Sequence, residues 1–498
     1  MIEYDWLKKW SLYSPQKVAL VDGDNNRSFT YQQLYVEAQK GAAFLAAKYQ
    51  ICQGDRIAVF STNEIEYLIL FFALQRLGAT IIPINVRLTA PELSYILKNC
   101  EPKLVLFEGE LQTTLDDTEY QGPKQKLYGE NSFAEALKTG TELFTEFLTE
   151  EMTPTMILYT SGTTGFPKGA IISQKMIFWN SLNTFLRLNI SQNDSAVIFL
   201  PFFHTGAWHV LTTPFIHHGA KIILTKKFDA EKVLQLTTKE SCTLLFGVPT
   251  TMDMMVQTKL FEDVNLSSLR YAIVGGEPMP IPLIEKWQKK GIPIRQGYGL
   301  TEFGPNVFSL NEEDAIRKRG SIGFENFYVQ AKVVDENGKE SGIDKIGELV
   351  LRGPMIMSGY WNNPTATAET IKDGWLHTGD LVKKDSEGFF YVVGRKKDMF
   401  KSGGENVYPP EIEQVIRTLD GIREVAVVGV KDQKWGEVGY AFLVKDREQI
   451  DESELLSHCK RNLAKFKIPK YFKFVQALPK GDSGKILKKN LVPSFPQI

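Results

Sequence analysis

Hydroxyl side chains, glycines and one lysine crowd into residues 159–169, which read YTSGTTGFPKG. Glycines let backbone N–H groups approach an anion closely, hydroxyls add hydrogen-bond donors, and lysine adds a mobile positive charge. The stretch is not a Walker loop, because Pro167 stands where the second Walker glycine would be and Gly169 where its Ser or Thr would be. We therefore predict a different triphosphate-binding loop. A flexible surface hairpin is the structural alternative, but it leaves the Pro-Lys-Gly end unexplained.

The elements around this loop indicate a layered α/β protein. Apolar runs at 156–159 and 170–172 predict that the loop joins strand to strand. Further strands alternate with helical stretches such as 64–77 and 230–239, as expected for buried sheets covered by helices. The predicted strands are Arg56–Phe60, Leu104–Phe107, Ala196–Leu200, Lys221–Leu224, Thr243–Phe246 and Tyr271–Val274.

The pattern changes in the last third of the chain. After about Gly347, short strands separated by turn residues predict a small β subdomain. A charged segment bracketed by glycines follows, and a separate α+β domain of about a hundred residues begins there. We predict an N-terminal domain over 1–394, a hinge over 395–400 and a C-terminal domain over 401–498.

Composition excludes several classes of function. The chain has 498 residues, a formal net charge of −1 and 43% hydrophobic residues, which is ordinary for a globular enzyme and argues against a nucleic-acid partner. Its four cysteines lie far apart, so neither a disulfide framework nor a zinc site is indicated. No signal peptide or transmembrane segment is apparent, and we expect a cytoplasmic protein. Peripheral membrane contact and a homodimer stay open.

Further motifs follow the phosphate loop in a fixed order. They are Gly275–Pro278, Gln296–Glu302, Gly347–Leu349, Gly359–Trp361, Trp375–Asp380, Gly394–Asp398, Ser402–Pro409 and Pro479–Ile486. Together with residues 159–169 they resemble the core motifs of the adenylate-forming superfamily, which contains acyl-CoA synthetases, peptide-synthetase adenylation domains and luciferases. The resemblance spans essentially the whole chain. It implies a large N-terminal domain and a mobile C-terminal domain that rotates about a hinge at Lys397.

The resemblance also implies two half-reactions. A carboxylate is a poor electrophile, so the enzyme first joins it to the α-phosphate of ATP with release of pyrophosphate. It then transfers the acyl group to a thiol with release of AMP. Charge that develops around the α-phosphorus is best met by preorganised donors, a metal ion and a cation. On the family pattern Lys485 is the catalytic cation, Thr301 contacts the α-phosphate, and Glu302 is the ligand of Mg²⁺, which needs only one or two protein carboxylates.

The family pattern assigns the other nucleotide contacts residue by residue. The residues expected to bind the β- and γ-phosphates are Thr160, Ser161, Gly162, Thr163, Thr164 and Lys168. The residues expected to bind the adenine are Gly275, Gly276, Glu277, Tyr298 and Gly299. Asp380 is expected to bind the ribose, assisted by Arg395. Outside this context a Gly-Gly pair or a Thr-Gly-Asp is usually only a turn.

The loop 200–208 resembles the family's acid-binding motif. Amino-acid-activating relatives usually carry an aspartate where His204 stands, because a buried ammonium needs a counter-charge. Trp208 resembles the gate tryptophan of long-chain fatty acyl-CoA synthetases, although a core tryptophan is the alternative. The expected acyl-binding positions are Phe203, His204, Trp208, Gly247, Val248 and Gly304, a set that suits an apolar tail.

Coenzyme A is the expected acceptor. The segment 401–408 resembles the pantetheine-tunnel loop of CoA ligases, and Ser402, Gly403 and Gly404 are its expected CoA-binding residues. We predict an ATP-dependent, magnesium-requiring acyl-CoA synthetase, an acid–thiol ligase, for medium- to long-chain fatty acids. An aryl or cinnamate-type acid–CoA ligase, an acyl-AMP ligase that loads a carrier protein, and a catalytically silent binding protein are the alternatives.

Overall fold

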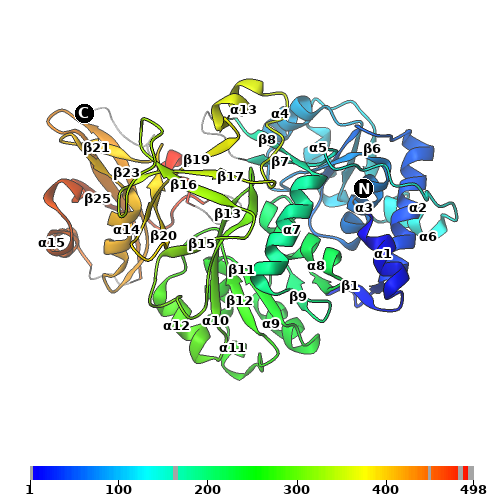
Figure 1. The fold of residues 1–498 in the computed structure, drawn as a ribbon, viewed down its shortest axis with the longest axis horizontal. Coiled ribbons are helices and arrows are strands. Elements are labelled where there is room, and N and C mark those ends of the chain that lie inside the picture. The colour runs from blue at the N-terminus through cyan, green and yellow to red at the C-terminus, as the bar shows by residue number, and fades with distance from the viewer. Residues whose placement is uncertain (1–3, 161–165, 447–449, 481–485, 492–498) are drawn as a thin grey trace. The chain divides into compact units, whose positions relative to one another are not determined.

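The computed structural model describes residues 4–160, 166–446, 450–480 and 486–491. The chain forms two compact units, and their helices and strands are labelled in Figure 1. The first comprises Met1–Ala331 and Leu351–Leu376, and the second Lys332–Val350 and His377–Ile498. The layered α/β fold predicted from the alternation of strands and helices is confirmed. The domain limits at 394 and 401 stay predictions.

A six-stranded sheet carries the phosphate-loop motif. Its order is β6-β5-β3-β4-β7-β8, and all neighbours are parallel except β7 and β8. The strands are β3 Arg56–Phe60, β4 Thr80–Pro83, β5 Leu104–Phe107, β6 Lys124–Lys126, β7 Pro154–Thr160 and β8 Lys168–Ser173. The central strands are buried on both faces, which explains their continuous apolar runs. The prediction that the loop joins two strands is confirmed.

A four-stranded sheet has the order β2-β1-β10-β9, with β1, β10 and β9 parallel. Its strands are β1 Val18–Asp22, β2 Ser28–Thr30, β9 Ser195–Ile198 and β10 Lys221–Leu224. Five further strands of the first unit pair in sequence order, parallel from β11 to β13 and antiparallel from β13 to β15. They are β11 Leu244–Gly247, β12 Tyr271–Val274, β13 Ile294–Leu300, β14 Gly304–Leu310 and β15 Ser321–Glu325.

Helices of the first unit cover these sheets, and one of them lies wholly in the core. All thirteen residues of α3 Ile65–Leu77 are buried, which accounts for its apolar character on every face. The others are α1 Trp6–Tyr13, α2 Tyr31–Tyr49, α4 Ala90–Cys100, α5 Gln112–Asp116, α6 Phe133–Thr139, α7 Gln174–Leu188, α8 Thr213–His218, α9 Ala230–Lys239, α10 Pro249–Val256, α11 Leu260–Asp263, α12 Ile281–Lys289 and α13 Pro364–Thr370. A π-helix, Ala207–Thr212, precedes α8.

The described residues of the second unit form strands and two α-helices. In one sheet β20 Phe390–Arg395 pairs antiparallel with β19 Trp375–Lys384, and β17 Gly347–Arg352 and β16 Gln330–Val334 continue the order. In the other sheet the order is β22-β21-β24-β23, with β25 on β24. Its elements are β21 Phe400–Ser402, β22 Glu405–Val407, α14 Pro409–Arg417, β23 Ile422–Asp432, β24 Gly436–Lys445, α15 Glu452–Asn462 and β25 Tyr471–Phe474.

Trp6 and Leu7, near the amino terminus, pack onto the protein. Trp6 is 6% exposed and Leu7 2%, and both belong to the main core cluster of the first unit. Leu12 and Tyr13 at the end of α1 are exposed. Among the described residues, no helix combines the length and the apolarity needed to cross a membrane.

Candidate active site

The two strands that flank the phosphate loop place Thr160 and Lys168 opposite each other. They are paired in the β7/β8 ladder, and the Thr160 hydroxyl lies 3.4 Å from the Lys168 carbonyl oxygen. Ser161, Gly162, Thr163 and Thr164 lie outside the described residues. The hairpin thus fixes the two ends of the loop, because its ladder runs without a break from residue 156 paired with 172 up to this pair.

Glu302, the expected magnesium ligand, lies just beyond the end of β13 and beside the same hairpin. Its Oε1 accepts a hydrogen bond of 2.9 Å from the Tyr360 hydroxyl, and the Thr160 hydroxyl lies 3.4 Å from the same atom. The Lys168 ammonium lies 5.2 Å from the centre of the Tyr360 ring. Four side chains from three distant segments therefore gather at one edge of the six-stranded sheet. We call Thr160, Lys168, Glu302 and Tyr360 the phosphate edge.

The charges of the phosphate edge have no ionic partners in the described part of the chain. The Glu302 carboxylate receives hydrogen bonds only from neutral hydroxyls there, and Lys168 faces an aromatic ring rather than a carboxylate. A carboxylate beside hydroxyls is a donor set that suits Mg²⁺, which keeps several waters and takes one or two protein carboxylates. The residues therefore fit a magnesium–triphosphate complex.

Backbone hydrogen bonds hold Tyr360 in place. Gly359 accepts from the Ile171 N–H at 2.9 Å, Trp361 donates to the Gly169 carbonyl at 2.7 Å, and Tyr360 itself bridges to β8. Burial, followed by the nearby Glu302 charge, raises the pKa of Tyr360, so its phenol stays protonated and donates. Sequence reasoning included Tyr360 in a motif but gave it no role. Only its pairing with Glu302, 58 positions away, identifies it.

The expected adenine-binding residues gather at the ends of β12 and β13. Gly275 and Gly276 directly follow β12, and Gly276 has a φ of +87°, a conformation that favours glycine. Tyr298 and Gly299 lie in β13, and a Cβ at Gly299 would come within 2.3 Å of the Pro305 backbone. Glu277 is exposed and Thr301 is half-buried. These positions lie at the carboxyl ends of parallel strands, where α/β sheets commonly bind ligands.

The expected ribose-binding pair lies in the second unit. Asp380 is 6% exposed, and the Arg395 Nε lies 3.0 Å from its Oδ1 in the β19/β20 ladder. Glu348 lies nearby in the same unit and accepts from Lys396 at 3.3 Å. Burial opposes ionisation of Glu348, but the attraction of Lys396 and a hydrogen bond from His377 outweigh it and lower the pKa of Glu348.

The expected CoA loop is the hairpin between β21 and β22. Ser402 ends β21 and is buried, and Gly403 and Gly404 have φ values of +61° and +88°. The Trp435 ring, which is 45% exposed, packs closely against Gly403: a Cβ at Gly403 would lie 3.1 Å from it. Lys397, the expected hinge residue, lies in the turn between β20 and β21. Lys485 lies outside the described residues.

The acid-motif loop, residues 200–208, is anchored by its two large aromatic residues. Trp208 is fully buried and stacks on Phe202 with ring centres 4.3 Å apart, while its indole N–H donates to the Phe202 carbonyl. Phe71 of α3 packs against the same indole at 4.9 Å. Phe203 and His204 are half-buried, with ring centres 4.6 Å apart. In this structure Trp208 is therefore a core side chain, and its gating role stays a prediction.

Two of the remaining expected acyl-binding positions are glycines with little room for a larger side chain. Gly247 ends β11, where a Cβ would lie 2.8 Å from the Thr251 hydroxyl, and Val248 precedes α10. Gly304 has a φ of +95°, and a Cβ there would lie 2.8 Å from the Asn180 Oδ1. None of the acyl-binding positions other than His204 is titratable, which suits a ligand with an apolar tail.

Two family models match most of the chain. The model of the AMP-binding enzyme matches residues 7–361, and that of the AMP-binding enzyme C-terminal domain matches residues 411–485. A long-chain-fatty-acid–CoA ligase of Mycobacterium tuberculosis is 36% identical, covering 97% of this chain and 96% of the relative. A feruloyl-CoA synthase of an Amycolatopsis species is 34% identical, covering 97% of each.

Solved structures share the fold. The o-succinylbenzoate coenzyme A synthetase of Bacillus subtilis, in complex with ATP and a magnesium ion, superposes with a TM-score of 0.90 at 29% identity. The match covers 98% of this chain and 99% of that one. The three relatives act on acids of different kinds, one aliphatic and two aromatic by their names.

Proposed function

Because the chain belongs to the AMP-binding enzyme family and is an acid–thiol ligase, we propose that it converts medium- to long-chain fatty acids to acyl-CoA through an acyl-adenylate. The observation that carries the proposal is the phosphate edge. It sets a carboxylate, two hydroxyls and a lysine beside the phosphate loop, and none of these charges has an ionic partner among the described residues. Such a site suits the magnesium salt of ATP.

Each side chain of the phosphate edge takes a defined part in the proposed first half-reaction. Glu302 holds Mg²⁺, which would supply charge neutralisation for the phosphates when bound. Lys168 and Thr160 hold the β- and γ-phosphates, and Thr301 contacts the α-phosphate. Tyr360 donates to Glu302 and fixes the orientation of its carboxylate. Lys485 supplies the positive charge at the α-phosphate, and CoA then accepts the acyl group beside Ser402, Gly403 and Gly404.

The apolar composition of the acyl-binding positions supports a monocarboxylic acid with a hydrocarbon tail. A second carboxylate on the substrate would need a counter-charge, and Phe203, Gly247, Val248 and Gly304 provide none. An aryl acid is the second candidate, since a feruloyl-CoA synthase matches this chain over nearly the same length as the fatty-acid ligase. Apolar pockets separate such tails by only about 1–3 kcal/mol per methylene-sized difference.

AMP release tests both candidates. Purified enzyme is given ATP, Mg²⁺ and a panel of short-, medium- and long-chain and aromatic acids, with and without CoA, and Lys485→Ala serves as the blank. CoA-dependent AMP release that peaks on medium- or long-chain acids supports the proposal. A peak on aromatic acids moves the assignment to the aryl ligases. Acyl-AMP that accumulates unchanged in the presence of CoA would instead favour a carrier-protein acceptor.

A further inference from the structure

Asn63 has a buried amide that reaches the beginning of the acid-motif loop from a different part of the chain. It lies between β3 and α3 and is 3% exposed. Its Nδ2 donates to the Leu200 carbonyl at 2.9 Å, and the Thr225 carbonyl lies 3.4 Å from the same nitrogen. Its Oδ1 accepts from the Phe202 N–H at 2.9 Å. One side chain therefore ties together three backbone groups that are more than a hundred positions away in sequence.

The chemistry of the partners fixes the orientation of the amide. Carbonyl oxygens can only accept, so they must face the Nδ2 group, and the Phe202 N–H can only donate, so it must face Oδ1. Leu200 and Phe202 stand on either side of Pro201, which has no N–H of its own. The amide therefore holds both sides of the point at which the chain leaves β9 and enters the acid-motif loop. An aspartate of equal size would place a carboxylate oxygen against the Leu200 carbonyl.

Phe202 passes this restraint on to the rest of the loop. Its ring stacks on Trp208, and its carbonyl accepts the Trp208 indole N–H. Phe203 and His204 lie between these two anchored residues in the sequence. The position of the Phe202 backbone therefore fixes the backbone positions from which the Phe203 and His204 side chains extend.

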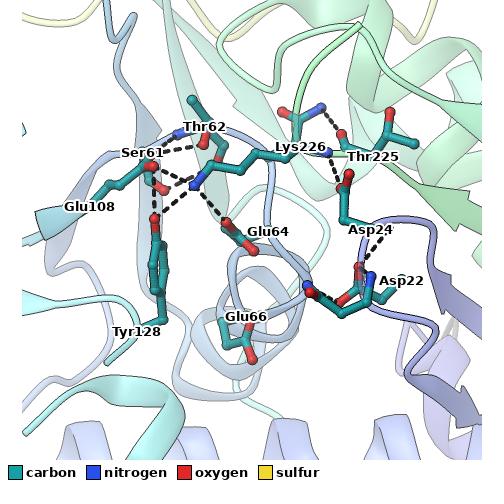
Figure 2. A network of polar contacts seen from close by, with 12 residues as sticks. Asp22, Asp24, Ser61, Thr62, Glu64, Glu66, Glu108, Tyr128, Thr225 and Lys226 are labelled. Carbon is teal, nitrogen blue, oxygen red and sulfur yellow. Dashed lines mark hydrogen bonds and ion pairs between the residues drawn. The ribbon is translucent and has the colours of Figure 1, made fainter. Parts of the chain in front are cut away.

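The loop that carries Asn63 is itself held in place. The Thr62 N–H and hydroxyl donate to the Glu108 carboxylate at 3.0 and 2.7 Å. Glu108 is paired at 2.6 Å with Lys226, which directly follows Thr225, whose carbonyl faces Asn63. Figure 2 shows Thr62, Glu108 and Lys226 converging on this loop. Asn63 is consequently held on one side by a charged cluster and on the other by the acid-motif loop.

We propose that Asn63 is a positioning residue that seats the acid-motif loop and thereby sets the affinity for the carboxylic acid and the preferred length of its tail. The inference rests on the proposed function, because that function makes Phe203, His204 and Trp208 the acid-binding residues. Asn63 acts through the backbone of Leu200 and Phe202 and not through contact with the substrate.

The test compares Asn63→Ala, Asn63→Ser and Asn63→Asp with a matched buried amide. Asn183 is fully buried, accepts from the Tyr328 N–H at 3.0 Å and has no hydrogen bond to residues 200–208, so Asn183→Ala is the control. The KM for the preferred acid, for ATP and for CoA is measured, together with the profile over tail lengths. Hydrogen exchange of peptides spanning 200–208 reports the seating of the loop independently of activity.

We expect Asn63→Ala to raise the KM for the acid about tenfold, to shift the preferred tail length, and to leave the KM for ATP within about twofold. Exchange at the Phe202 amide should rise in all three Asn63 variants and not in Asn183→Ala. If Asn63→Ala does not fold, Asn63→Ser carries the measurement, since a hydroxyl retains part of the hydrogen bonding.

An equal rise in the KM for acid and for ATP, with an unchanged tail profile, would overturn the inference alone. Unchanged exchange at Phe202 would overturn it as well. A wild-type enzyme that releases no AMP with any acid would overturn the proposed function, and the inference with it.

Discussion

Two carboxylates at strand ends of the first unit are held in opposite ways. Glu302 in the phosphate edge accepts from the neutral hydroxyls of Tyr360 and Thr160. Glu108, directly after β5, is paired with Lys226 at 2.6 Å and also accepts from Thr62 and Tyr128. We call Thr62, Glu64, Glu108, Tyr128 and Lys226 the Lys226 cluster (Figure 2). A charge that the protein already neutralises serves the fold, whereas a charge surrounded by neutral donors is available to a ligand.

The pKa values of the Lys226 cluster show how completely its charges are matched. Burial alone would raise the pKa of Glu108, but hydrogen bonds from Lys226 and Thr62 outweigh it and lower the pKa to about 2. Burial raises the pKa of Glu64 to about 7, against the attraction of Lys226 at 3.3 Å. One lysine thus fully stabilises one carboxylate and only partly the other.

The largest effect should come from removing the charge of the phosphate edge. We expect Glu302→Gln to lower kcat by about 10²–10³, the usual cost of losing a charge-stabilising group at a reacting centre. Its melting temperature should stay near that of the wild type, because no ion pair among the described residues is broken. The measurement is AMP release over a Mg²⁺ titration, with the exposed Glu262→Gln as the control. Unchanged activity and an unchanged Mg²⁺ requirement would remove Glu302 from the proposed site.

The matching change in the Lys226 cluster should damage stability instead. Glu108→Gln leaves Lys226 with the more distant Glu64, and we expect the free energy of unfolding to fall by about 3 kcal/mol, as when one partner of a buried pair is removed. Urea unfolding at pH 7 measures it. Because the pKa of Glu108 is depressed, its stabilising contribution is present above about pH 4.5 and is lost as the pH falls toward 2. Glu108→Gln should therefore lose less stability than the wild type on acidification.

Glu64 should show the opposite pH dependence. Its pKa is raised to about 7, so the stability gained by keeping it protonated is complete below about pH 4.5 and is lost as the pH rises through 7. We expect Glu64→Gln to make the free energy of unfolding less dependent on pH. At pH 8 the variant should be at least as stable as the wild type, with a gain of up to about 2 kcal/mol. Unfolding free energies at pH 5 and pH 8 measure it. A variant that is less stable than the wild type at pH 8 would show that the ion pair with Lys226 dominates over burial.

Local patterns in the sequence are sufficient to predict many of the buried strands of the first unit. The strands Arg56–Phe60, Leu104–Phe107 and Tyr271–Val274 are confirmed at the predicted residues, because buried parallel strands read as short apolar runs. The prediction that residues 161–167 lie between two strands is confirmed for the same reason. An apolar run predicts a buried strand whatever its place in the sheet, so the strand can be predicted without knowing the sheet order or its neighbours.

Features that depend on distant pairing could not be predicted. Glu302 and Tyr360 are 58 positions apart, and Asn63 and Leu200 are 137 apart. Nothing in the segment around each of these residues identifies its distant partner. The packing of Trp208 against Phe71 depends on the same long-range geometry. The sequence therefore predicts which segments carry the chemistry, and the fold determines which side chains meet.

Glu302 and Glu108 each accept a hydrogen bond from one tyrosine, so removing a single hydroxyl from each tyrosine compares the two carboxylates directly. Tyr360→Phe removes the 2.9 Å hydrogen bond to Glu302 and keeps the ring over which Lys168 lies. Losing one such bond costs about 1 kcal/mol, so we expect the Mg²⁺ concentration for half-maximal activity to rise about fivefold, with little change in stability. Tyr128→Phe removes the 2.7 Å hydrogen bond to Glu108 and the 2.8 Å hydrogen bond from Lys226, and it should lower stability by about 1–2 kcal/mol without altering the Mg²⁺ requirement. If both variants change the same property, the two carboxylates do not differ in function. If the effects separate, the phosphate edge holds the metal and the Lys226 cluster supports the fold.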